Sequence, residues 1–107
     1  MSESTEQVQT ARRLWEERRQ EPFPDSLRRV TFEGTDVWLL ELDIAGCVLR
    51  WLDNGGPLDS KNSVLLQSCI EDLERVIPEI SDPAAVQYCR RLHRLAVLVS
   101  RNPPGTT

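Results

Sequence analysis

Lysine, histidine and long apolar runs are scarce in this chain of 107 residues, and each shortage excludes a class of protein. Lys61 is the only lysine, and 13 basic against 17 acidic side chains give a net charge of −4. Because nucleic-acid binding depends on positive charge along the phosphates, we predict no nucleic-acid partner. No run approaches the roughly 20 apolar residues that a bilayer-spanning helix needs, so we also predict no membrane segment.

The sequence also lacks the marks of a secreted protein. It begins MSESTEQVQT, which is polar and acidic, whereas an export signal has a basic start and an apolar stretch. The three cysteines, Cys47, Cys69 and Cys89, are fewer than a secreted disulfide framework carries, and their number is odd. We therefore expect a cytoplasmic protein with free thiols, folded as one domain over 1–107.

Catalytic and cofactor signatures are missing as well. No G-x-S-x-G, H-E-x-x-H or phosphate-loop pattern occurs, and the glycine pair Gly55-Gly56 follows a predicted helix instead of preceding one. His93 is the only histidine, so any general-base mechanism would have to use it. We predict that the protein is not an enzyme and carries no cofactor.

What the sequence does have is a helical period in its apolar residues. Asp36, Asp59 and Asp82 precede three of the periodic segments as N-caps, and Pro83 occupies a first helical position. We predict an all-α fold, a compact four-helix bundle with disordered ends at about 1–4 and 102–107. The predicted helices span about 5–20, 37–53, 60–77 and 83–100.

Residues 28–41 allow a second interpretation. Val30 and Phe32 alternate with polar residues, and Glu33-Gly34 has the composition to turn a hairpin into Val37–Leu40. A helix starting after Asp36 is favoured because the apolar period then continues unbroken. An α+β fold with a short hairpin at 28–41 stays open as the alternative.

The helix predicted over 37–53 is apolar on two sides. One stripe would face the core, and a second contains Leu42, Ala45, Leu49 and Leu52. A helix this apolar is either central to its bundle or shared with a partner chain. The second stripe therefore predicts an interface, which a two-fold dimer would cover. Trp38 would suit an anchor of that interface if it is partly exposed.

A basic strip follows one face of the helix predicted over 83–100. The strip contains Gln87, Arg90, Arg94 and Arg101, and no acidic residue follows Asp82. Such a strip is suited to an acidic partner surface or a phosphate. The alternative is a solvated face whose arginines pair with acids of neighbouring helices.

Three cysteines and a histidine are an acceptable tetrahedral zinc set. Here the set would be Cys47, Cys69, Cys89 and His93. The cysteines lack the C-x-x-C spacing of zinc signatures and occupy ordinary core positions, where a thiol behaves as a small apolar group. We favour buried thiols and predict no metal.

The stretches LLELDIAGC (39–47) and WLDNGGPLD (51–59) resemble those of short, largely uncharacterised bacterial helical proteins. The resemblance implies a bacterial origin and an unbroken helix over 37–53. It implies no activity, substrate or site residue.

These observations rank three functions. The first is a non-enzymatic protein–protein interaction module that binds an unknown partner protein or a second copy of itself. The second is an immunity protein or antitoxin-like inhibitor, because a small acidic protein suits a basic target. The third is a small metal- or ligand-binding protein built on the cysteines and His93.

Overall fold

A computed structural model describes residues 3–53 and 58–101, and its four long helices confirm the predicted helical bundle. The helix α2 starts and ends as predicted, and so does α4. The helix α1 begins at Glu3, before the predicted start near residue 5, and α3 ends at Val76. In chain order the elements are α1 (Glu3–Gln20), η1 (Asp25–Leu27), β1 (Thr31–Phe32), β2 (Thr35–Asp36), α2 (Val37–Asp53), α3 (Ser60–Val76), η2 (Ile77–Glu79) and α4 (Pro83–Ser100).

Aspartate side chains fix the starts of three helices. Asp36 accepts the backbone N–H of Trp38 at 2.9 Å, and Asp59 accepts that of Asn62 at 2.8 Å. Asp82 accepts the N–H of Ala84 at 3.2 Å, one residue after Pro83. Each carboxylate satisfies a backbone donor that has no partner within its helix.

The two interpretations of residues 28–41 are both partly correct. A two-stranded antiparallel hairpin pairs Thr31 with Asp36, but it ends there, and Val37–Leu40 belong to α2. Glu33 and Gly34 form the turn with φ of +54° and +84°, the left-handed pair that a tight hairpin turn requires. Arg75 of α3 holds the hairpin through the Thr35 hydroxyl at 2.8 Å.

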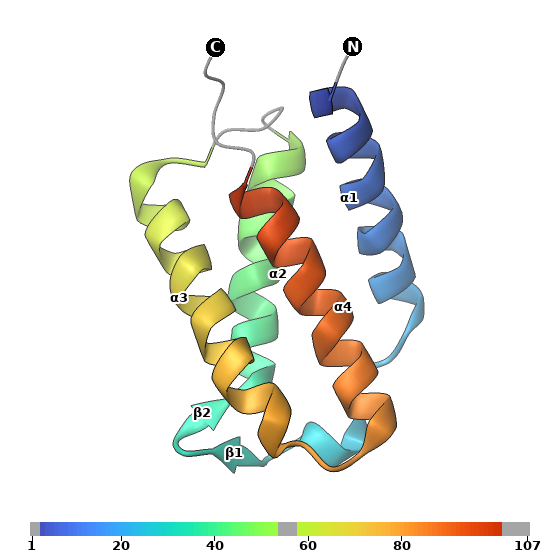
Figure 1. The fold of residues 1–107 in the computed structure, drawn as a ribbon, viewed down its shortest axis with the longest axis vertical. Helices are drawn as coiled ribbons and strands as arrows, with labels where there is room; N and C mark the ends of the chain where they lie inside the picture. Colours follow the sequence, from blue (N-terminus) through green and yellow to red (C-terminus); the bar gives the residue numbers. More distant parts are fainter. Residues whose placement is uncertain (1–2, 54–57, 102–107) are drawn as a thin grey trace.

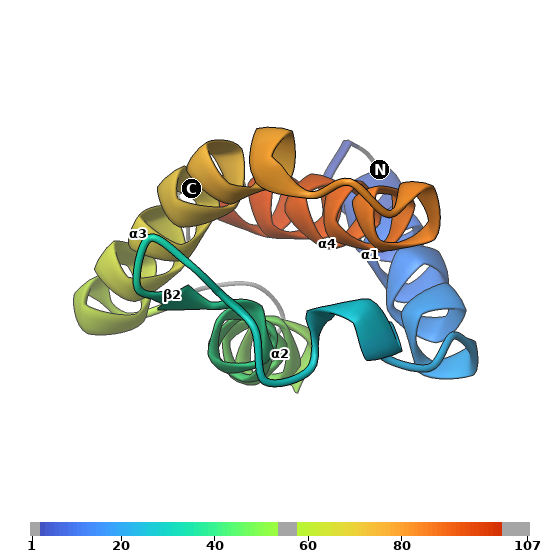
Figure 2. The ribbon, with the colours of Figure 1, turned by 90° about the horizontal axis from the view of Figure 1, so that it is seen from below.

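The four helices run alternately up and down (Figure 1). Helices α1, α4 and α3 lie side by side in one curved layer, and α2 packs on the concave side of that layer against α3 and α4 (Figure 2). The hairpin lies below α2 and α3, and η1 lies beside α2 on the side of α1. One side of α2 therefore faces the bundle, and the other side faces outward.

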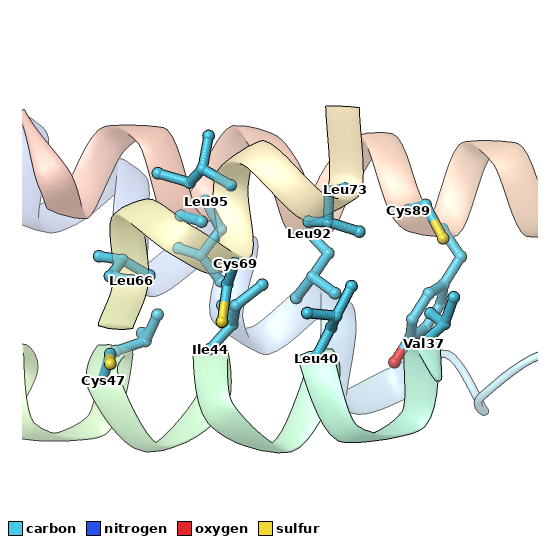
Figure 3. Close-up of a cluster of buried hydrophobic side chains, with 14 of the residues drawn as sticks. Val37, Leu40, Ile44, Cys47, Leu66, Cys69, Leu73, Cys89, Leu92 and Leu95 are labelled. Carbon is cyan, nitrogen blue, oxygen red and sulfur yellow. The ribbon is translucent and has the colours of Figure 1, made fainter. Parts of the chain in front are cut away.

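The core lies between this layer and α2. Side chains of α2, α3 and α4 meet there, including Ile44, Leu73 and Leu92 (Figure 3). From α1, Ala11 and Leu14 are fully buried, while Val8 and Trp15 pack on the core with part of their surface exposed. On α3, Leu65 is 38% exposed and lies outside this core.

A charged group is buried inside this core. Glu41 of α2 is only 3% exposed, and its carboxylate accepts hydrogen bonds from Arg18 of α1. The Tyr88 hydroxyl of α4 donates to the same oxygen at 3.2 Å. The Arg18 guanidinium also lies 4.5 Å above the Trp15 ring. Burial and the neighbouring carboxylate both raise the pKa of Tyr88, which keeps it a donor.

Some predictions concern residues outside the described ranges. They are the helix stop at 54–57 and disorder at 1–2 and 102–107, whereas residues 3 and 4 form the first turn of α1. Within 3–53 and 58–101, no helix is both long and apolar enough to cross a bilayer.

Candidate functional site

The outward side of α2 is an exposed apolar surface. Four large apolar side chains on it are well exposed, namely Trp38 (41%), Leu39 (56%), Leu42 (47%) and Leu49 (45%). The buried side of the same helix carries Val37, Ile44 and Val48, each of which is 0% exposed. An apolar surface this extended along one helix is typical of a contact with another helix.

The outermost line of α2 differs by part of a turn from the predicted stripe. The predicted stripe included Ala45 and Leu52, but both are partly buried, and Leu52 packs against the core. The outward line of α2 ends at the exposed Asp53. Before it, Leu39, Leu42 and Leu49 are exposed and Gly46 is half-buried, at alternating spacings of three and four residues. We call these four residues the outer face of α2. The centre of this face differs from that of the predicted stripe because α3 covers one flank of α2 and the short η1 covers the other.

Gly46 leaves a gap in the middle of the outer face. A Cβ atom at Gly46 would meet nothing within 4 Å, so no neighbouring element requires the glycine. Asp43 and Arg50 lie along one edge of the face, on either side of Gly46, and both are exposed. Neither forms an ion pair within the described residues.

Trp38 stands at the N-terminal end of this face and is partly exposed. Its ring meets Phe23 edge to face at 5.1 Å between centroids. A hollow of about 500 Å³ opens beside it, and Arg28 and Arg29 form part of the wall. Arg29 has φ of +63°, a strained value for a residue with a side chain. The hollow is also lined by Phe23, Asp25 and Asp36, so its charges are balanced.

The basic strip lies on the opposite side of the molecule, where α4 turns away from the core. Gln87, Arg90, Arg94 and Arg101 are all exposed, as the sequence predicted. Arg90, Arg94 and Arg101 form no ion pair with any described residue, whereas Arg91 pairs with Glu17 and Glu21 of α1. A hollow of about 290 Å³ between α1 and α4 is lined by Leu14, Glu17, Gln87, Arg90, Arg91 and Arg94.

The proposed zinc ligands are not gathered into a site. The three cysteines lie at different levels along the core, with Cys89 near Val37 and Cys47 toward Leu66 (Figure 3). His93 contacts Glu74 of α3 at 2.9 Å on the surface. Among the residues that the structure describes, no three histidine, cysteine or acidic side chains could hold one metal ion.

The cysteines are buried free thiols with little nucleophilic character. Burial raises the pKa of Cys69 to about 12 and that of Cys89 to about 11. Burial also raises the pKa of Cys47, helped by the Asp43 carboxylate. Because only the thiolate attacks electrophiles, these positions do not resemble reactive cysteines.

Comparisons of the chain with protein-family models, with curated proteins and with solved structures find no match. No family is assigned on this basis. The resemblance of 39–47 and 51–59 to bacterial helical proteins stays a prediction.

Proposed function

We propose that this protein is a non-enzymatic protein–protein interaction module, and that it packs the outer face of α2 against a helix of another chain. The exposure of Leu39, Leu42 and Leu49 along one side of α2 carries the proposal. Burying a leucine side chain contributes about 1.5–3 kcal/mol, so leaving three half exposed in water forgoes stability that a partner would supply. The three free thiols support a cytoplasmic site of action.

The inhibitor hypothesis gains less support. An inhibitor that masks a basic protein needs an acidic surface, but the outer side of α4 is itself basic. The metal hypothesis needs ligands that converge, and Cys47 and Cys89 lie apart.

Site-specific photo-crosslinking in the native host tests the proposal. A photoreactive amino acid at position 42 is expected to give one major covalent adduct, with this chain or with another protein. The matched control places it at position 64, because Val64 is 70% exposed on α3 and lies off the outer face. An adduct at 42 and none at 64 supports the proposal. The absence of any adduct at 42, or equal yields at both positions, contradicts it.

A further inference from the structure

Asp43 and Arg50 lie on opposite sides of Gly46 along α2, at distances that differ by one residue. Asp43 lies three residues before Gly46, and Arg50 lies four residues after it, on the same edge. Leu42 lies four residues before Gly46 and Leu49 three residues after it. A two-fold rotation near Gly46 therefore brings Leu42 to within one residue of the level of Leu49 in the second copy, and Asp43 to within one residue of the level of Arg50 on the charged edge.

We propose, building on the function proposed above, that the helix bound to the outer face is α2 of a second copy, running antiparallel and crossing at Gly46. A two-fold axis near Gly46 places Leu42 against Leu49 of the other copy. The same axis places Asp43 opposite Arg50 of the other copy, and the symmetry repeats both contacts.

Gly46 permits this crossing. Two helices approach most closely where neither has a side chain, and the glycine lies at the midpoint of the leucines. Within its own chain Gly46 has open space beside it and contacts no element that would need a glycine. A glycine inside a helix lowers stability by about 1 kcal/mol relative to alanine, and an antiparallel crossing gives a reason for it.

A parallel arrangement does not fit the same surface. It would place the edge of one copy that carries Asp43 and Arg50 beside the opposite, leucine edge of the other copy, so neither charge would meet one of opposite sign. Both residues are exposed and without an ion pair among the described residues, which leaves them available to a second chain. Charge complementarity therefore selects the antiparallel direction.

Charge exchange tests the orientation. In sedimentation equilibrium at low salt, wild type is expected to dimerise, while Asp43→Arg and Arg50→Asp each weaken the dimer about tenfold. The double variant D43R/R50D restores the pairs in reverse and is expected within about threefold of wild type. Arg12→Asp is the matched control, because Arg12 is exposed on α1 and has no ion pair with a described residue. It should leave the dissociation constant unchanged.

Gly46→Leu provides a second test that does not depend on charge. The variant is expected to raise the thermal stability of the isolated chain, because leucine favours helix and nothing blocks it. It should also weaken the dimer at least tenfold by forcing the helices apart.

Three results would overturn the antiparallel dimer. They are a wild-type chain that stays monomeric, a double variant no better than the single ones, or G46L dimers as tight as wild type. If the crosslink at position 42 captures a different protein, the interaction function stands and only the second copy is excluded. If position 42 captures nothing, the function itself fails.

Discussion

Removing the arginine of the buried ion pair should destabilise the fold far more than removing a surface arginine. In Arg18→Met the Glu41 carboxylate stays buried with the Tyr88 hydroxyl as its remaining donor at 3.2 Å. Breaking a buried pair from one side costs about 3–5 kcal/mol. The Arg18 side chain keeps 19% of its surface exposed and that of Glu41 keeps 4%, so we expect the lower end, about 3 kcal/mol.

That loss is large for a chain of this length. Small domains have a total stability of about 5–15 kcal/mol, and a loss of 3 kcal/mol lowers the melting temperature by roughly 10–20 °C. Urea unfolding followed by circular dichroism measures the free energy, and an unchanged m-value shows that the folded and unfolded states still expose comparable surface.

Two controls separate the buried pair from a general effect of lost charge. Arg13→Met removes an ion pair with Glu17 whose partners are 57% and 44% exposed, and it should cost about 0–1 kcal/mol. The double variant R18M/E41M removes both buried charges and should recover most of the loss. The reasoning is wrong if R18M costs no more than R13M, or if R18M/E41M is as unstable as R18M.

Three further predictions concern other parts of the chain. The hydrogen bond from the Asn62 backbone N–H lowers the pKa of Asp59, so this cap stabilises the fold fully above the usual carboxyl pKa near 4. Its contribution is lost as the pH falls through the lowered pKa. Between pH 6 and pH 2, the urea midpoint of Asp59→Asn should therefore fall less than that of wild type. The raised pKa values of the thiols predict that Ellman's reagent at pH 8 labels all three cysteines in urea but reacts far more slowly with the folded protein. Rapid labelling of the folded protein would contradict the burial of the cysteines. R90E/R94E should change the free energy of unfolding by no more than about 0.5 kcal/mol, because neither arginine has an ion-pair partner among the described residues. Arg91→Glu places a carboxylate beside Glu17 and Glu21, so it should measurably lower the free energy of unfolding in the same urea assay.

Local signals predicted most of the fold. Asp36, Asp59 and Asp82 marked helix starts because a short acidic side chain before an apolar period satisfies free backbone donors. The Glu33-Gly34 turn was visible too, and Val30 and Phe32 alternate with polar residues before it. Because each strand is only two residues long, this pattern could not show where the hairpin ends. Val37–Leu40 was ambiguous because a short apolar run fits strand and helix equally, and the cap at Asp36 decided it.

The candidate site was less accessible to sequence reasoning. The periodicity of α2 revealed a second apolar side, but not that Leu39 is its most exposed large side chain, because exposure depends on where the neighbouring helices lie. Glu41 was missed as a buried group, although its position between Val37 and Ile44 on the core stripe was a signal. Its partner Arg18 lies 23 residues away, so only the packing of α1 could reveal the pair.

Helix α1 is held in the bundle by few buried side chains, and this affects how the molecule unfolds locally. In the part of α1 whose side chains are described, only Ala11 and Leu14 are fully buried, and Arg18 bonds to α2 through Glu41. Helices α2, α3 and α4 each pack against the other two, whereas α1 packs mainly against α4. We therefore expect partial unfolding to begin with release of α1 as a unit, which would break the buried ion pair in the same step. Amide hydrogens of α1 should exchange together, ahead of those in the other three helices.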